Sequence, residues 1–275
     1  MSEGLRPESG TRVIDDECAR RLDEAAGVMR GARRILFITG AGISADSGLP
    51  TYRGVGGLYH ERLTDDGLTI EEALSGSMMA GHPEIAWKYI AEIEANCRGA
   101  RPNIAHRILA ALERERPGVS VLTQNVDGLH RDAGSRNLIE IHGTVHRLRC
   151  MECPHSRSVP DYAGLAIPPH CPVCGGILRP DVVLFGEMLP ERELVRLEAV
   201  LSEGTDLVVS IGTTSVFPYI AGPVWWARQA GVPTIEINPG ETEVSHLVTC
   251  RLRMRAAEAM PELWQRLHPH EPAED

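Results

Sequence analysis

The chain has 275 residues, enough for one large α/β domain or for a large domain with a smaller insertion. It carries 28 Lys and Arg against 38 Asp and Glu, and this net charge of −10 argues against a protein that primarily binds nucleic acid. The first ten residues are polar and no run of about 18 apolar residues occurs, so we expect no signal peptide, no membrane span and a cytoplasmic location.

Apolar runs of strand length alternate with helical patterns along the chain. A helix is expected from Asp15 or Asp16 to Gly31, and the first strand follows at Ile35–Thr39. Further strand-like runs are 119–123, 138–142, 182–185, 207–211 and 234–237, and helical patterns cover 105–112, 191–201 and 219–230. Nearly continuous apolar strands that alternate with helices predict a doubly wound, Rossmann-like parallel sheet.

Two segments interrupt this alternation, one with a helix-like stretch at 84–94 and one containing paired cysteines. We expect them to form a smaller lobe, made of a helical insertion and a zinc ribbon, beside the sheet domain. The predicted boundaries are 12–52, 118–146 and 180–268 for the Rossmann-like sheet domain, 53–117 and 147–179 for the small lobe, and 1–11 and 269–275 for flexible tails. A ligand would bind in the cleft between the lobes.

Four cysteines form two C-x-x-C pairs separated by 17 residues: Cys150, Cys153, Cys171 and Cys174. Disulfides and free buried thiols are the alternatives, but paired cysteines in a reducing compartment usually bind metal. A complete set of four thiolates leaves no open coordination position, which indicates one structural zinc ion. The other cysteines, Cys18, Cys97 and Cys250, are expected to be small buried hydrophobic residues.

The first strand runs into Gly40-Ala41-Gly42-Ile43-Ser44-Ala45, which fits the G-x-G-x-x-A form of a dinucleotide-binding turn. Its glycines permit a tight turn and let the backbone approach a pyrophosphate. Glycine turns after strands are common, so a purely structural turn remains an alternative. Glu61 and Asp65 lie near the distance expected for a ribose-binding acid, but not at the end of a second strand, which counts against an ordinary dehydrogenase.

Polar side chains gather after the neighbouring strands. Tyr52 and Arg53 follow the glycine turn, the run 123–130 contributes two amides and an acid, and His142 ends the next strand-like run. Because strand ends on one edge of such a sheet converge, these groups are expected to meet. His142 alone could be a satisfied core histidine, but in this company a catalytic role is favoured.

These motifs together resemble the sirtuin family of NAD-dependent protein lysine deacylases. The matching stretches are GAGISADSGLPTYRG from Gly40, TQNVDGLH from Thr123, IHG from Ile141, the four cysteines, VVLFGE from Val182, GTTS from Gly212 and IN from Ile237. They keep the family order from about residue 30 to about residue 261.

The resemblance implies that NAD is consumed as a co-substrate and that acylated-lysine proteins are the partners. It assigns cofactor binding to Gly40, Ala41, Gly42, Ser44, Tyr52, Arg53, Gln124, Asn125, Asp127, Gly212, Thr213, Ser215, Asn238 and Ala256. At Thr214 the family more often has Ser. It further implies that one segment binds the substrate peptide as an added strand. This segment consists of Val182, Val183, Leu184, Phe185, Gly186 and Glu187.

The same resemblance suggests the mechanism. The acyl-lysine carbonyl attacks the ribose carbon that bears nicotinamide, nicotinamide leaves, and His142 acts as general base on a ribose hydroxyl. Histidine suits this role because its usual pKa, about 6.5, lies near neutral pH. Asn125 would orient a water molecule or a ribose hydroxyl. Lysine and an acylated ADP-ribose are the products.

The acyl group is less well specified by the sequence. Sirtuins of the desuccinylase type carry Tyr-x-x-Arg in the small-lobe helix, whereas this chain reads Trp87-Lys88-Tyr89-Ile90-Ala91-Glu92, with Glu92 at the expected arginine position. A carboxylate there would repel a succinyl group, so we expect a deacetylase or a deacylase for neutral chains. Arg98 or Arg101 could substitute for the arginine.

Two other functions are compatible with these motifs. One is an NAD-dependent protein ADP-ribosyltransferase on the same scaffold, and the other is a catalytically silent NAD-binding module. The intact set of His142, Gln124, Asn125 and Asp127 disfavours the silent module.

Overall fold

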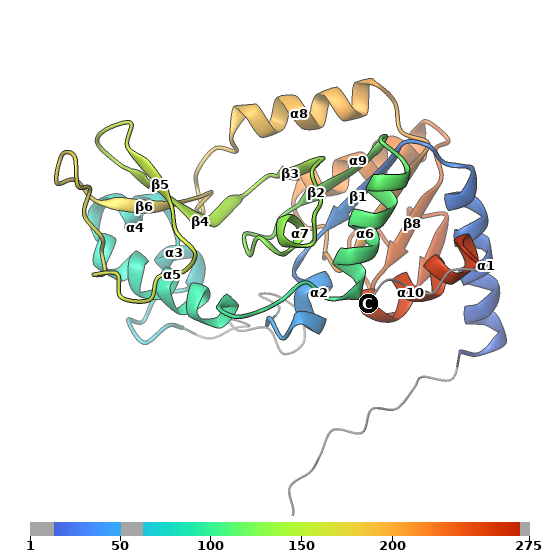
Figure 1. The fold of residues 1–275 in the computed structure, drawn as a ribbon, viewed down its shortest axis with the longest axis horizontal. Helices are drawn as coiled ribbons and strands as arrows, with labels where there is room; N and C mark the ends of the chain where they lie inside the picture. Colours follow the sequence, from blue (N-terminus) through green and yellow to red (C-terminus); the bar gives the residue numbers. More distant parts are fainter. Residues whose placement is uncertain (1–13, 51–62, 270–275) are drawn as a thin grey trace, which may run out of the picture.

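The computed structural model describes residues 14–50 and 63–269, and two lobes lie side by side along the long axis of Figure 1. Within these residues the large sheet has six strands in the order β3-β2-β1-β7-β8-β9, and all its pairings are parallel. The strands are β1 (Ile35–Thr39), β2 (Val119–Thr123), β3 (Leu138–Glu140), β7 (Leu207–Ile211), β8 (Thr234–Ile237) and β9 (Cys250–Leu252). The doubly wound fold expected from the sequence is confirmed.

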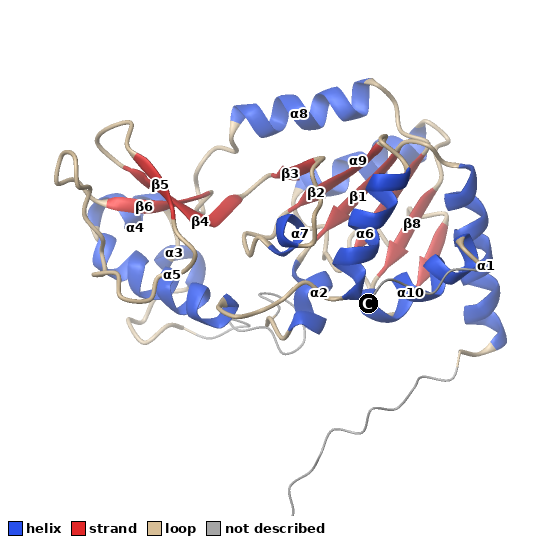
Figure 2. Cartoon of the chain, in the orientation of Figure 1, coloured by secondary structure: helices blue, strands red, loops and turns tan. Residues whose placement is uncertain are grey.

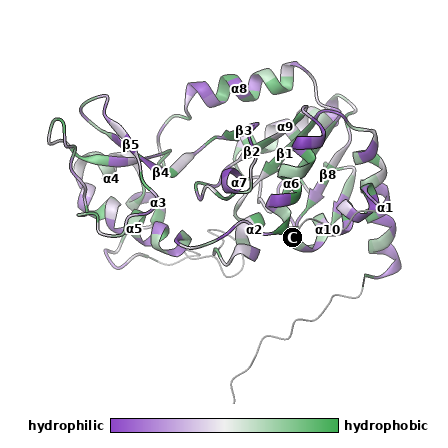
Figure 3. Cartoon of the chain, viewed as in Figure 1, coloured by the Kyte–Doolittle hydropathy of each residue, from purple (hydrophilic) through white to green (hydrophobic). Residues whose placement is uncertain are grey.

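Helices cover both faces of the large sheet (Figure 2). One layer contains α1 (Asp16–Gly31), α6 (Ile104–Glu115) and α10 (Ala256–Leu267), and the other contains α8 (Glu191–Ser202) and α9 (Pro218–Gln229). Side chains of β1 alternate between the two layers, with Phe37 in the first core and Leu36 and Ile38 in the second. The central strands are therefore buried on both sides. In contrast, hydrophobic and hydrophilic residues alternate along α8 in Figure 3.

The starts of two helices follow from their sequences. In α1, the Asp15 carboxylate accepts from the Cys18 N–H at 2.8 Å, and the helix ends at Gly31 as predicted. In α9, Pro218 occupies the first helical position, and Phe217 before it is extended, as the residue preceding a proline usually is. No helix within residues 14–50 and 63–269 is both long and apolar enough to cross a membrane.

The small lobe has its own sheet and its own core. Its antiparallel strands lie in the order β5-β4-β6, with β4 (Gly143–Cys150), β5 (Ser156–Ser158) and β6 (Leu178–Val182). Its helices are α3 (Ile70–Ala73), α4 (Gly76–Gly81) and α5 (Pro83–Cys97). Trp87 of α5 is fully buried, donates its indole N–H to the Leu178 carbonyl at 2.9 Å, and packs edge-on against Tyr162. This contact fastens α5 to the small sheet.

The short elements that face the small lobe come from the large one. They are α2 (Ala41–Ser44), the 3₁₀ turn η1 (Ala45–Ser47) and α7 (Leu129–Asp132).

The run Val182–Phe185 does not form a strand of the parallel sheet, so that prediction is wrong. β6 ends at Val182 and pairs antiparallel with β4, while Phe185 forms an isolated bridge with Ser75. The sequence pattern of an apolar run does not reveal which sheet the run joins. In the structure Val182 and Val183 are only half-buried, unlike the residues of the central parallel strands.

The predicted division into lobes stays a prediction, but two strands cross its boundaries. β4 passes through the boundary at 146/147 and β6 through the one at 179/180. Both belong entirely to the small sheet. These strands favour boundaries close to residues 142 and 183.

Candidate active site and metal centre

A cavity of about 1170 Å³ lies between the lobes, where β1, β2, β7 and β8 end at their carboxyl termini. This interlobe cavity is where a doubly wound sheet usually binds ligands. Its lining includes the following residues predicted from the sequence: Gly40, Ala41, Gly42, Ser44, Gln124, Asn125, Asp127, His142, Val182, Val183, Leu184, Phe185, Gly186, Glu187, Gly212, Thr213, Asn238 and Ala256. Tyr52 and Arg53 lie outside the described residues.

Glycines bring two loops of the large lobe into backbone contact at this cavity. The Gly42 N–H donates to the Gly212 carbonyl at 2.8 Å, and a Cβ on Gly42 would lie only 2.7 Å from the Gly212 Cα. A Cβ on Gly40 would lie 2.8 Å from the Thr213 Cβ. Gly212 itself has a φ of +59°, in the left-handed region that glycine adopts readily. The loops can approach each other, and a ligand can approach their backbone, only because side chains are absent.

His142 lies between β3 and β4 and is held at both ring nitrogens. Its Nδ1 lies 3.0 Å from the Gln124 carbonyl oxygen, and its Nε2 lies 2.7 Å from the Tyr219 hydroxyl oxygen. Since a carbonyl oxygen can only accept, Nδ1 carries the proton and Nε2 accepts from Tyr219. Burial lowers the pKa of His142 below its usual value, so the neutral ring predominates at pH 7, with Nε2 as its basic nitrogen.

Asn125 and Asp127 are fixed by a polar cluster behind the glycines. The Asn125 side-chain amide donates to the Gly40 carbonyl and to Ser44 Oγ, both at 3.1 Å. Ser44 Oγ in turn donates to Asp127 Oδ2 at 2.8 Å, and the Leu129 N–H donates to Asp127 Oδ1 at 2.9 Å. Burial raises the pKa of Asp127, because its charged form loses water. The cluster therefore presents an oriented amide and a carboxyl group to the same cavity.

Thr213 holds two further polar side chains of the cavity lining. Its hydroxyl accepts from the Gln124 side-chain amide at 2.8 Å, and its carbonyl accepts from the Asn238 side-chain amide at 3.1 Å. Ser215 differs from the other predicted residues, since it is buried with a φ of 57° and does not line the cavity, although Thr214 does. The cofactor-binding role of Ser215 stays a prediction.

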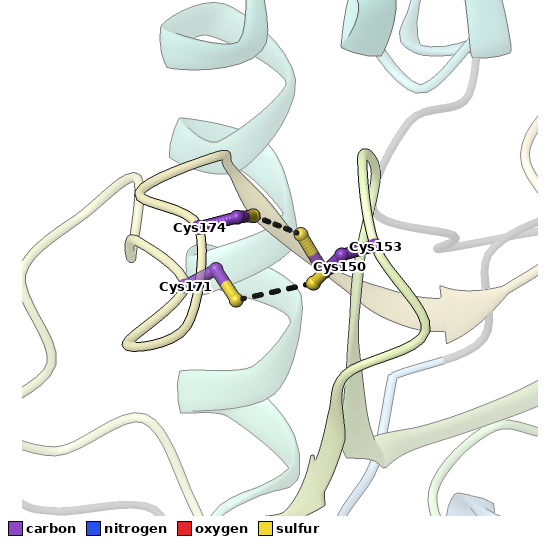
Figure 4. Close-up of side chains that lie close together, drawn as sticks. All are labelled: Cys150, Cys153, Cys171 and Cys174. Atoms are coloured by element: carbon purple, nitrogen blue, oxygen red, sulfur yellow. Dashed lines mark hydrogen bonds between the residues drawn. The ribbon is translucent and has the colours of Figure 1, made fainter.

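The four cysteines of the two C-x-x-C pairs converge in the small lobe (Figure 4). The Sγ–Sγ distance is 3.5 Å between Cys150 and Cys174 and 3.7 Å between Cys153 and Cys171, and all four sulfurs lie within 4.8 Å of one another. A tetrahedron with Zn–S bonds of about 2.3 Å has edges of about 3.8 Å, whereas a disulfide requires about 2.05 Å. The cluster fits zinc and does not fit disulfides.

Backbone N–H groups orient two of these sulfurs. The Glu152 N–H donates to Cys150 Sγ and the Val173 N–H donates to Cys171 Sγ, each at 3.4 Å. None of the four cysteines lines the interlobe cavity. The site therefore has the donor set and the location of a structural metal centre.

Comparison with known proteins matches this architecture to one family. A Sir2 family model matches residues 40–218. The NAD-dependent protein deacylase 2 of Pseudomonas syringae pv. tomato is 54% identical over 243 residues, which span 87% of this chain and 98% of that protein. The chain belongs to the Sir2 family.

Solved Sir2 structures share the fold of this Sir2-family chain. A Sir2 homologue in complex with NAD gives a TM-score of 0.80 at 36% identity, covering 90% of this chain and 94% of that one. A Sir2–p53 peptide–NAD⁺ structure gives 0.76 at 29% identity, covering 88% and 96%. The sirtuin resemblance found in the sequence is confirmed.

Among the cavity residues of this Sir2-family chain that the sequence analysis did not assign to the site are Ile90, Ile93 and Tyr219. Ile90 and Ile93 lie three residues apart on α5, and this spacing within the expected helix could have indicated a shared face. Tyr219 contacts His142 because it is the second residue of α9, which begins at Pro218. No sequence pattern marks this helix start as functional.

The position assigned to Glu92 is also corrected. Glu92 is exposed and does not line the cavity, so its carboxylate does not stand where a desuccinylase would place arginine. Ile90 and Ile93, each one residue further along α5 than Tyr89 and Glu92, have the same Tyr-x-x-Arg spacing and both line the cavity. A helix turns about 100° per residue, so an assignment shifted by one residue moves a side chain from the cavity to solvent.

Proposed function

We propose that this chain is an NAD-dependent protein lysine deacylase, which transfers the acyl group of a lysine side chain to ADP-ribose and releases nicotinamide. The observation that carries the proposal is the unprotonated Nε2 of His142, in a cavity shared with Asn125, Asp127 and the glycine loops of a Sir2 fold. The Pseudomonas syringae relative is named as an NAD-dependent protein deacylase, which supports the same activity.

The residues around the glycine contact fit NAD. Gly40, Gly42 and Gly212 leave backbone exposed to a pyrophosphate, and Asn238 offers an amide side chain for a ribose. Asn125 and Asp127 would hold the nicotinamide side. Bound NAD supplies the acceptor for the acyl group and the nicotinamide leaving group.

His142 acts as the general base on a ribose hydroxyl. Its Nε2 takes the proton, and the Gln124 carbonyl, bonded to Nδ1, stabilises the imidazolium that results. Burial disfavours the charged ring before the reaction, so the base is available at neutral pH. Asn125 is held by Gly40 and Ser44 and can orient a water molecule or a hydroxyl beside it.

The segment Val182–Glu187 is proposed to pair with the acylated peptide. Several of its backbone groups are already used within the chain: the Val183 N–H donates to the His142 carbonyl, the Leu184 N–H to Glu187 Oε2, and the Phe185 N–H to the Leu74 carbonyl. A peptide strand would therefore use other backbone groups of this segment. Glu187 is itself fixed by the nearly buried Arg179, which keeps the segment in place.

The acyl group is proposed to be neutral. On the small-lobe side the cavity is lined by apolar side chains such as Ile90, Ile93 and Val145. Among the described lining residues, Arg255 is the sole cation, and it lies beside Ala256 on the large lobe, whereas Asp127 and Glu187 add acidic groups. An acyl carboxylate would lose water there without gaining a positive partner.

The test combines the purified chain, NAD and peptides that carry acetyl-, longer acyl- or succinyl-lysine. Deacylated peptide and nicotinamide should appear together and in equal amounts, and His142→Ala should abolish the deacylated peptide while NAD still binds. ADP-ribose attached to protein without deacylation would instead indicate the ADP-ribosyltransferase, and absence of both products would contradict an enzyme. The predicted cytoplasmic location stays a prediction.

A further inference from the structure

The Tyr219 hydroxyl is hydrogen-bonded to His142 Nε2, the nitrogen that accepts the proton in the proposed chemistry. It lies 2.7 Å from His142 Nε2, and Tyr219 also lines the interlobe cavity. The Tyr219 ring is stacked on Phe217 with centroids 5.4 Å apart, and both rings meet the His142 ring edge-on. The phenol therefore contacts the base and lines the cavity at the same time.

The direction of the hydrogen bond between Tyr219 and His142 Nε2 follows from the contact that His142 Nδ1 makes. The Gln124 carbonyl can only accept, so Nδ1 keeps its proton and Nε2 presents a lone pair. Tyr219 must then be the donor. A phenol oxygen that donates can also accept, so it can receive a hydrogen bond from a second hydroxyl at the same time.

We propose that Tyr219 is a catalytic residue that relays the proton from the ribose hydroxyl to His142. This inference rests on the proposed deacylase function.

The step is a double proton transfer that leaves the tyrosine unchanged. The ribose O–H bond breaks and its proton binds to Tyr219 Oη, while the Tyr219 O–H bond breaks and its proton binds to His142 Nε2. The electron pair of the broken ribose O–H bond stays on the ribose oxygen, which becomes the nucleophile. His142 becomes an imidazolium with Nδ1–H still bonded to Gln124, and Tyr219 ends as a neutral phenol.

The variant Tyr219→Phe isolates the hydroxyl, because the ring that stacks on Phe217 is kept. The first measurement needs no NAD: the ¹⁵N chemical shift of His142 Nε2 in the free protein should change when the donated hydrogen bond is lost. The Nδ1 shift should remain nearly constant, since the Gln124 carbonyl is untouched. An unchanged Nε2 shift would show that the hydrogen bond is absent in solution and would overturn the proposal.

The second measurement separates the chemical steps. Exchange of free nicotinamide into NAD, in the presence of acylated peptide, requires only the first step, before the base acts. Tyr219→Phe should therefore retain this exchange and lower kcat for deacylation at least about tenfold, within the usual contribution of general acid–base catalysis. KM for NAD and for peptide should remain close to the wild-type values. An unchanged or increased kcat would show that the hydroxyl only covers the resting base, and would overturn the relay.

Tyr89→Phe is the matched control, because it removes one phenol hydroxyl from a residue that does not line the cavity. It should alter neither measurement. Failure of the proposed function is recognised separately: a wild-type chain that gives no deacylated peptide contradicts the deacylase itself. A wild-type deacylase with a fully active Tyr219→Phe variant contradicts the relay alone.

Discussion

At the scale of single residues, the burial of His142 assists its proposed work. Burial disfavours the charged imidazolium, so the pKa lies below the usual value of about 6.5 and the neutral base persists into mildly acidic solution. We expect the acidic limb of the kcat profile for deacylation to have its midpoint below that usual value. The measurement is a pH–rate profile of deacylation, with nicotinamide exchange as the internal comparison. A midpoint above the usual value would contradict the assignment of the limb to this histidine.

Gly42 provides a second prediction at this scale. Gly42→Ala would place a methyl group 2.7 Å from the Gly212 Cα, and backbone on both sides cannot move away easily. Overpacking of this kind costs about 1–3 kcal/mol, so both the unfolding midpoint and NAD affinity should fall. Thermal unfolding and calorimetric titration with NAD would measure the two effects.

Gly27→Ala is the control for Gly42→Ala. Gly27 lies inside α1, and its added methyl group would meet nothing within 4 Å. Alanine favours a helix interior, so this variant should be more stable by up to about 1 kcal/mol and should bind NAD normally. Equal losses in the two variants would show that the glycine contact has no special importance.

At the scale of elements, we expect α5 to select the acyl group, because Ile90 and Ile93 on this helix line the cavity and Glu92 is exposed. The double variant Ile90→Tyr/Ile93→Arg would place a phenol and a guanidinium where an acyl carboxylate could meet them. We expect the ratio of succinyl-lysine to acetyl-lysine kcat/KM to rise at least about tenfold, which corresponds to about 1.4 kcal/mol. Peptide assays on both substrates measure this ratio.

Glu92→Arg adds an arginine to the same helix on its exposed side. It should leave the succinyl-to-acetyl ratio at the wild-type value. A rise in that variant equal to the rise in the double variant would show that overall charge, and not the cavity-facing side of α5, sets the preference.

The elements also show what the sequence could reveal. The runs 35–39, 119–123, 207–211 and 234–237 are strands with the predicted bounds, because each is buried on both faces and thus continuously apolar. β9 was missed because it has only three residues, with Arg251 at its centre. The segment 182–185 was misassigned, since composition cannot tell a strand that joins the large sheet from one at the boundary between lobes.

For the candidate site, linear motifs identified the cavity residues that follow strand ends. The glycine loop, the run 123–130 and His142 all follow parallel strands, and the sheet brings them together. Tyr219 and Ile93 come from helices, and their approach depends on helix rotation and on Pro218 at the start of α9. Such contacts arise from tertiary packing, which the sequence pattern does not encode locally.

At the scale of the whole molecule, two lobes with separate cores share one cavity, so the cavity needs both lobes in place. The small lobe contains the four-cysteine cluster, and zinc binding to such sites supplies free energy on the order of 10 kcal/mol. Cys174→Ser should remove the zinc, expose the small lobe to proteolysis and abolish deacylation. Metal analysis, limited proteolysis and the peptide assay are the measurements.

Cys18→Ser is the comparison for Cys174→Ser, since Cys18 lies on α1 and outside the cluster. It should keep one zinc ion per chain and normal activity. Full deacylation by a zinc-free protein would contradict a structural role for the metal.

The strand β4 begins directly after His142 and ends at Cys150. Its pairing with β6 shifts register between Thr144 and Leu148, and the strand carries the chain from the interlobe cavity to the metal centre. Cobalt(II) bound by the same four thiolates would thus be a paramagnetic reference point fixed in the small lobe. Relaxation of nuclei on α9, which belongs to the other lobe, would depend on how far the lobes separate. The metal centre, which lies outside the cavity, would then report the distance between the lobes.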